Sequence, residues 1–250
     1  MSVSIGLVGQ NFSLVAADTR TTTIAAKGKF TDGAKKLFLT KFGWVAESGG
    51  VVLSNTFFNN LLNSNNIKTR KQIYTCWLMA IRETVRFAEK HADPKLYSEI
   101  SQEVNSSQAI CSINYFKDNA PEMEVDTIDF VYGRRELKAI NSLIVNPPKP
   151  TIRTKRLIAK YSAIAKEITN VHEAIYTIAC FMDDLSKISK WVSNIVDCGI
   201  SLKISDDEII FLRVTEAAKD IKQLYIERQD LSEIMMFSGN KVMEGSYGKD

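Results

Sequence analysis

Ser2 follows the initiator methionine directly, which offers a nucleophile together with its own base. A small second residue is what methionine removal requires, and removal leaves a hydroxyl and a free α-amine on one serine. The α-amine has a pKa of about 7.7–8.0, so it can accept the hydroxyl proton near neutral pH. Activation of a hydroxyl by an N-terminal amine is a recognised route to nucleophilic catalysis. The start of the chain therefore predicts acyl-transfer chemistry at Ser2 once Met1 is removed.

Two charged residues, Asp18 and Lys36, are expected to approach Ser2. Apolar and small residues alternate over residues 3–7, which is the period of a half-buried strand. A short turn precedes a second strand over residues 12–17, and this hairpin returns Asp18 towards Ser2. Lys36 begins the next apolar run. A lysine beside the serine would favour the oxyanion form of the hydroxyl and lower the pKa of the amine, and Asp18 would hold that lysine in place.

A turn of small residues supplies candidate oxyanion donors. Trp44-Val45-Ala46 is an apolar strand, and Ser48-Gly49-Gly50 follows it. Backbone N–H groups exposed in such a turn can receive the charge that develops on a carbonyl oxygen during acyl transfer.

Three runs in this order resemble the N-terminal third of a proteasome β-subunit. They are Ala-Ala-Asp-Thr-Arg from residue 16, Asp-Gly-x-Lys-Lys-Leu-Phe from residue 32, and the Ser-Gly turn at residue 48. The resemblance is specific over residues 2 to about 50 and architectural beyond them. Because no propeptide precedes Ser2, we expect the closest relatives to be short bacterial homologues such as the ancestral-β-subunit (Anbu) proteins. The resemblance implies an N-terminal-nucleophile (Ntn) hydrolase fold, which is an α+β, four-layer α-β-β-α sandwich.

The resemblance also implies the catalytic roles. Ser2 falls in the place of the nucleophile, and Asp18 in that of the acidic residue after the second strand. Lys36 falls in the place of the catalytic lysine, although the loop before it is slightly longer here. Gly49 falls best in the place of the oxyanion-hole glycine. The implied reaction is hydrolysis of a peptide bond through an acyl-enzyme on Ser2.

Further residues receive supporting or substrate-binding roles from the same resemblance. Arg20 matches the arginine that follows the acidic residue, and Thr22 falls near the residue that aligns the substrate. Glu47 lies near the floor of the specificity pocket, which favours a basic side chain on the acyl side of the substrate.

The chain departs from the family pattern in two places. A late Asp-x-x-Ser-Gly-Gly turn normally helps to hold the terminal residue, but the corresponding stretch reads Ser-Lys-Trp-Val-Ser-Asn from residue 189. Its aspartate and both glycines are missing, and Ser193 is a displaced substitute. The mid-chain serine of the family falls on Ser142, which lacks the glycine neighbours. How the amine is positioned therefore stays open.

Three functions remain open on these residues: a peptidase, a non-catalytic building block and a small-molecule amidase on the same fold. Taken singly, each motif also suits an ordinary surface, because an Asp18–Arg20 ion pair or a Ser-Gly-Gly loop is common. The resemblance implies a homo-oligomer, as a ring or an open spiral. It implies a peptide or unfolded-protein substrate and leaves an ATP-driven unfoldase open as a partner.

The length, net charge and composition of the chain narrow the class of protein to which it can belong. The chain has 250 residues and a net charge of +3, and no basic cluster with interleaved aromatics points to nucleic acid. No apolar run reaches the ~18–20 residues of a membrane span, and no secretory signal is visible. The cysteines, which include no Cys-x-x-Cys pair, are expected to be buried free thiols in a reducing, cytoplasmic compartment. The presence of only two histidines argues against a zinc site, and no metal or cofactor is expected.

Periodicity predicts a single domain over residues 1–250 with strands and helices in alternating blocks. After the N-terminal strands, a helix is expected at 53–62. A second helix is expected to begin with a capping box at 69–72 and to continue to 88. An irregular stretch at 92–106 should follow, with Pro94 as a helix breaker. Strands are expected at 109–116, 123–132 and 137–145, helices at 157–168 and 170–185, strands at 195–204 and 209–214, a helix at 216–236, and a loose tail from 239.

Overall fold

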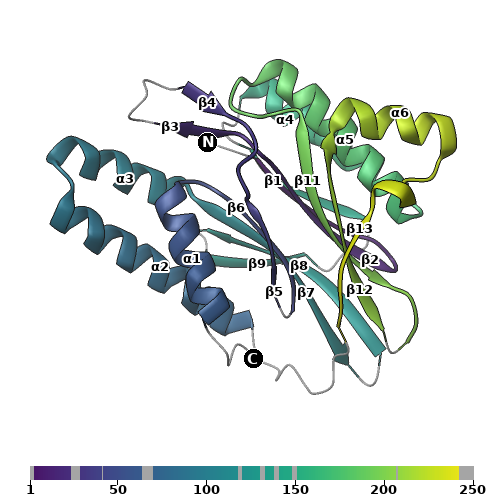
Figure 1. Cartoon of the computed structure of the whole chain (residues 1–250), viewed down its shortest axis with the longest axis horizontal. Helices are drawn as coiled ribbons and strands as arrows, with labels where there is room; N and C mark the ends of the chain where they lie inside the picture. Colours follow the sequence, from purple (N-terminus) through teal and green to yellow (C-terminus); the bar gives the residue numbers. More distant parts are fainter. Residues whose placement is uncertain are drawn as a thin grey trace.

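The chain forms four stacked layers, with two antiparallel sheets between two layers of helices (Figure 1). The computed structural model describes residues 3–23, 29–40, 42–63, 70–117, 120–129, 133–137, 141–147, 151–206 and 208–241. The expected α-β-β-α sandwich is confirmed.

The first sheet carries both ends of the described chain. It has six strands in the order β10-β1-β2-β11-β12-β13. Their bounds are Ser142–Asn146, Ser4–Val8, Phe12–Asp18, Ile195–Lys203, Ile209–Ala217 and Met236–Lys241. Every neighbouring pair is antiparallel.

The second sheet is built from the middle of the chain. It has five strands in the order β5-β6-β7-β8-β9, with bounds Leu37–Thr40, Gly43–Ser48, Gln108–Lys117, Ala120–Asp129 and Gly133–Leu137. A separate two-stranded hairpin, β3 (Thr21–Thr23) with β4 (Lys29–Thr31), follows β2.

Each sheet is covered by helices on its outer face. The second sheet packs against α1 (Val51–Asn63), α2 (Arg70–His91) and α3 (Pro94–Ser106). The first sheet packs against α4 (Ile152–Ala165), α5 (Val171–Ile188) and α6 (Ala218–Arg228). None of the helices among the described residues is long and apolar enough to cross a bilayer.

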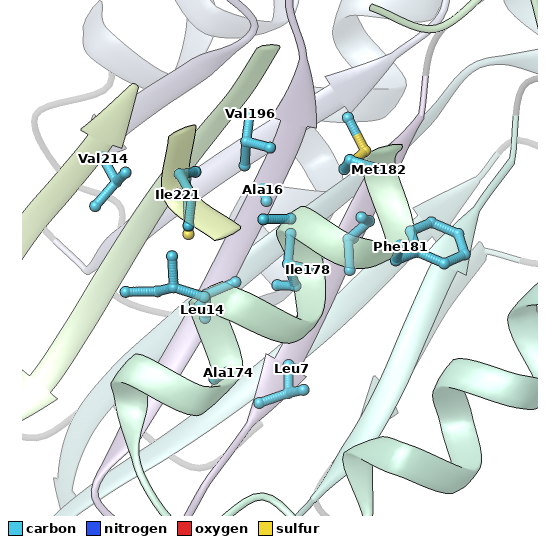
Figure 2. Close-up of a cluster of buried hydrophobic side chains, with 14 of the residues drawn as sticks. Leu7, Leu14, Ala16, Ala174, Ile178, Phe181, Met182, Val196, Val214 and Ile221 are labelled. Carbon is cyan, nitrogen blue, oxygen red and sulfur yellow. The ribbon is translucent and has the colours of Figure 1, made fainter. Parts of the chain in front are cut away.

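Strand β2 shows why the central strands read as continuous apolar runs. Its alternate residues Leu14 and Ala16 face α5, in the core drawn in Figure 2, whereas Val15 and Ala17 face the second sheet. Side chains alternate across a strand, so a strand covered on both faces has no solvent side. All seven residues of β2 are buried, and the strand therefore holds Asp18 rigidly at its end.

Several expected elements need correction. Residues 94–106 are helical, because Pro94 occupies the first turn of α3 and Asp93 caps its N-terminus by accepting from two backbone N–H groups at 2.9 Å. A proline lacks only an N–H that has no partner in a first turn anyway. Pro94 does separate α2 from α3, as expected of a helix breaker, but the irregular structure expected after it was wrong.

Two other expectations changed in the second half of the chain. The single strand expected at 137–145 is divided between β9 and β10, which belong to different sheets. The helix expected up to residue 236 ends at Arg228, where Gln229 adopts a positive φ of 52°, and β13 follows it. Residues 239–241, expected in a loose tail, are in β13, and the rest of that tail lies outside the described residues, as does Thr69 of the expected capping box.

Candidate active site

Asp18 lies at the end of β2, next to the start of β1, and its side chain has no exposure to solvent. Its Oδ1 accepts a hydrogen bond from the Val3 N–H at 2.9 Å. Its Oδ2 accepts from the N–H of Arg20 at 2.9 Å and of Ser193 at 3.4 Å. The Val3 nitrogen belongs to the peptide bond that joins residues 2 and 3, so Asp18 holds the first strand directly behind its start.

Lys36 completes this group from the second sheet's side. Its Nζ lies 3.1 Å from Asp18 Oδ1 and also donates to the carbonyl of Arg20. The side chain is 11% exposed, and burial lowers the pKa of Lys36 while Asp18 opposes that change. The position before β5 therefore keeps a cation on the carboxylate that contacts the Val3 N–H, just before β1.

Arg20 does not pair with Asp18 through its side chain. Its guanidinium instead makes a two-point contact with Asp32, with Nε at 2.8 Å from Oδ1 and Nη2 at 2.9 Å from Oδ2. Its Nη1 donates to the carbonyls of Lys190 and Val192, at 2.9 and 3.1 Å. Arg20 therefore connects three separate segments of the chain beside the Asp18 carboxylate.

Ser193 meets the same carboxylate, although the turn that carries it has no family glycines. In addition to its N–H bond to Asp18, its Oγ accepts from the Thr19 N–H at 3.1 Å and lies 3.2 Å from Thr19 Oγ1. Ser193 is fully buried. The structure thus brings Asp18, Lys36, Arg20 and Ser193 together.

The Ser48–Gly50 turn ends β6 and leads into α1. A Cβ at Gly49 would lie 1.9 Å from Ser107 Oγ and 2.5 Å from Glu47 Oε1, so only glycine fits there without movement. The Gly50 N–H donates to Ser107 Oγ at 3.3 Å, and Ser4 Oγ donates to Ser48 Oγ at 3.4 Å across the two sheets. The turn is therefore packed against α3 and tied to β1.

Glu47 lies beneath this turn and is 2% exposed. Burial raises its pKa to about 8, and the contacts with Ser54 and Lys36 oppose this. Ser54 Oγ donates to Oε2, but among the described residues no partner reaches Oε1. A buried carboxyl oxygen without a partner is costly unless it is protonated or a further donor reaches it.

Three expected site residues lie elsewhere or are not described. Ser2 lies outside the described residues. Thr22 pairs with Phe30 in the β3–β4 hairpin, and its side chain is not described. Ser142 pairs with Val8, at the far end of β1 from Asp18, so the structure does not bring it to this group.

Three residues that sequence reasoning missed contribute here. Asp32 anchors Arg20, Ser107 packs on Gly49, and Asn146 pairs with Ser4 at the same end of β1 as Val3. Asn146 Nδ2 donates to Ser4 Oγ and to Thr127 Oγ1, both at 3.4 Å. The Asn-Pro pair at 146–147, which marks the end of a strand, was the available signal for Asn146.

Among the described residues, no group of three or more His, Cys, Asp or Glu side chains could hold a metal ion.

A four-layer sandwich with an acid–lysine pair beside the start of its first strand has the architecture of proteasome β-subunit-like proteins. Solved structures with this fold include the Anbu (ancestral beta-subunit) proteins. A mutant of Anbu from Hyphomicrobium sp. strain MC1 matches with a TM-score of 0.61 and 15% identity, covering 96% of this chain and 100% of that one. Anbu from Yersinia bercovieri matches with a TM-score of 0.60 and 13% identity, covering 90% and 93%.

A second Anbu structure from Hyphomicrobium sp. strain MC1 gives a TM-score of 0.59 and 14% identity, covering 93% of this chain and 97% of that one. No family model and no curated protein matches the sequence. At such low identity the likeness establishes the fold, and it confirms the resemblance to Anbu proteins that the first fifty residues carry.

Proposed function

We propose that this chain is a proteasome-like peptidase of the N-terminal-nucleophile class, with Ser2 as its nucleophile after Met1 is removed. One observation carries the proposal: Asp18 Oδ1 accepts from the Val3 N–H, at 2.9 Å, and from the Lys36 ammonium, at 3.1 Å. The Val3 nitrogen is bonded to the Ser2 carbonyl carbon, which supports a role for this buried cation at the residue whose hydroxyl must become nucleophilic.

The proposed reaction proceeds in two acyl-transfer steps. The Ser2 α-amine, directly or through a water, takes the hydroxyl proton, and Oγ attacks the substrate carbonyl. The Gly49 N–H stabilises the oxyanion, and the proton passes to the leaving amine as the C–N bond breaks. Water then hydrolyses the acyl-enzyme ester and regenerates Ser2. Lys36 supplies positive charge and Asp18 orients it.

Substrate selection is part of the proposal. Thr22, in β3, is proposed to align the substrate backbone. Oε1 of Glu47, for which no described residue is a partner, is an acceptor that a substrate ammonium or guanidinium would satisfy. We therefore expect a preference for Lys or Arg on the acyl side. An unbiased fluorogenic peptide panel without that preference would remove Glu47 from this role.

The chain is further proposed to act as one domain in a homo-oligomeric ring or spiral, in the cytoplasm. Strands from both ends of the chain share the first sheet, which supports a single folding unit. None of the four cysteines, all of which the structure describes, forms a disulfide, which suits a reducing compartment. An ATP-driven unfoldase remains a candidate partner for this assembly.

The proposal is tested on purified protein by intact-mass measurement before and after treatment with a peptide epoxyketone or β-lactone. Loss of Met1 and a single covalent adduct on Ser2 are expected. Retention of Met1 would favour the second candidate, a non-catalytic building block. That alternative is favoured by the absence of the family aspartate and glycines before β11. Turnover of small amides but not peptides would indicate a small-molecule amidase.

A further inference from the structure

The loop between α5 and β11 is held in place by one side chain from the other end of the chain. Arg20 Nη1 donates to the carbonyls of Lys190 and Val192, at 2.9 and 3.1 Å. The other edge of the guanidinium is fixed by Asp32, through contacts of 2.8 and 2.9 Å. A planar guanidinium with both edges occupied has little freedom to rotate, so the two loop carbonyls are held at a set position relative to β4.

Ser193, the residue that follows Val192, contacts the Asp18 carboxylate of the candidate site. Ser193 donates its N–H to Asp18 Oδ2 at 3.4 Å, and its Oγ accepts from the Thr19 N–H at 3.1 Å. The Arg20 N–H donates to the same Asp18 oxygen at 2.9 Å. The two backbone N–H groups that donate to Asp18 Oδ2 thus belong to Arg20 itself and to the 190–193 loop that the Arg20 side chain contacts.

We propose that Arg20 and Asp32 are positioning residues that fix the 190–193 loop so that Ser193 orients the Asp18 carboxylate. In this chain the ion pair would do what a glycine-rich turn does in the resembled family, by a different physical means. The inference deepens the proposed function, because Asp18 acts there on Lys36 and on the amide behind Ser2.

The exposure of the pair supports a positioning role over a stabilising one. The side chains of Arg20 and Asp32 are 23% and 36% exposed, and ion pairs with such access to water contribute little to folding stability. Their geometry is nevertheless specific, because four N–H···O contacts converge on one guanidinium. A lysine ammonium carries charge but cannot make the two-edged contact.

An aromatic contact next to the ion pair provides a spectroscopic readout. Trp191 packs edge-on against Phe30 of β4, with ring centroids 5.4 Å apart, and the Arg20 guanidinium lies 5.5 Å from the Phe30 ring centroid. The chain has three tryptophans, and the other two, Trp44 and Trp77, are buried. Quenching of tryptophan fluorescence by acrylamide therefore reports mainly on the 190–193 loop.

The test compares Arg20→Lys and Asp32→Ala with the wild type in the full chain. Arg228→Lys is the matched control, because Arg228 forms an exposed pair with Glu233 beyond α6. The readouts are amide hydrogen exchange over residues 18–20 and 190–194, acrylamide quenching, and the rate of adduct formation with a β-lactone. Both site variants are expected to fold, to exchange and quench faster, and to form adduct about ten- to a hundredfold more slowly, the range expected for misplaced catalytic groups. The control should match the wild type.

Two results would overturn the inference. Wild-type exchange and quenching in both Arg20→Lys and Asp32→Ala would show that the pair does not fix the loop. A loosened loop with an unchanged adduct rate would show that the loop does not position the site. If the wild type itself forms no adduct, the proposed peptidase fails, while hydrogen exchange at Ser193 and Thr19 still decides whether Arg20 and Asp32 hold the loop against Asp18.

Discussion

Lys36, just before β5, and Asp18, at the end of β2, form an ion pair of 3.1 Å, and the Asp18 carboxylate is completely buried. The carboxylate is surrounded by donors: the ammonium of Lys36 and the backbone N–H groups of Val3, Arg20 and Ser193. A buried charge with this many partners is stable, whereas one that loses a partner becomes costly. This relationship leads to the first two predictions.

Lys36→Ala should reduce the rate of Ser2 adduct formation, and of peptide turnover, by roughly a hundredfold or more. The reason is that the positive charge beside the proposed nucleophile is removed, while Asp18 keeps its backbone donors and the fold persists. The rate is measured by mass spectrometry with a β-lactone. Lys187→Ala, in an exposed pair with Asp183, is the control. Full turnover in Lys36→Ala would refute the assignment of this lysine.

Asp18→Asn should destabilise the protein as well as inactivate it. Each carboxylate oxygen accepts from two donors, so an asparagine of the same shape must direct its NH₂ group at one pair of them. We expect a loss of about 3–5 kcal/mol in the free energy of unfolding, as for a buried charge pair that loses one member. Urea denaturation measures it, with the exposed Asp206→Asn as control. A change below about 1 kcal/mol would contradict the described donor set.

Glu47 should make the stability of the protein depend on pH. Its folded pKa of about 8 is raised above the unfolded value of 4.5, so the folded state retains a proton that the unfolded chain releases. Stability from this group is therefore highest below the unfolded pKa and falls as pH rises from about 5 to 8, by roughly 4–5 kcal/mol in total.

Glu47→Gln removes this titration and should flatten the pH dependence of the free energy of unfolding over the same range. Glutamine preserves an acceptor for Ser54 and adds donors. Raising the pH from 5 to 8 should therefore destabilise the variant less than it destabilises the wild type. The exposed Glu89→Gln on α2 is the matched control. Parallel pH profiles for the wild type and Glu47→Gln would show that Glu47 ionises normally.

The first two strands and Asp18 were predictable because their information is local. Alternation over residues 3–7, a turn and a second apolar run define a hairpin, and the register that puts Val3 opposite Asp18 follows from the hairpin. The cap of α5 was equally local: Asn170 accepts from the Glu173 N–H at 2.9 Å, as the spacing indicated. Local rules of this kind do not depend on the rest of the fold.

The contacts that complete the site depend on tertiary structure, and the sequence could not supply them. Arg20 could have paired with several acidic residues, and its choice of Asp32 is set by where the β3–β4 hairpin places β4. Likewise the approach of Ser107 to Gly49 follows from the pairing of β6 with β7, since Ser48 lies opposite Gln108. The division of residues 133–146 between two sheets has no periodic signal, because both parts are strands.

Gly49 and Ser107 lie so close together that adding a side chain at one and removing it from the other tests the role of the turn that carries the proposed oxyanion donor. Gly49→Ala places a Cβ 1.9 Å from Ser107 Oγ, and Ser107 cannot retreat because it is fully buried and donates to the Glu103 carbonyl at 2.8 Å. The turn must move, so we expect a loss of about 1–3 kcal/mol in stability, as for an overpacked core, and a slower β-lactone reaction at Ser2 by roughly a hundredfold. Ser107→Gly alone, at the residue that follows α3, should change the rate little.

The double variant Gly49→Ala/Ser107→Gly removes the clash with the Ser107 side chain, although the 2.5 Å approach to Glu47 Oε1 remains, and it should recover part of the adduct rate and of the stability. Recovery would show that the position of the turn, and not the identity of the residue at 49, governs the reaction, because the backbone N–H is present in both. The comparison uses initial rates and urea midpoints of the four proteins in one double-mutant cycle, which isolates the coupling of the two sites. Purely additive effects would mean that Gly49 and Ser107 do not compete for the same volume, and the described packing of the turn against α3 would then be wrong.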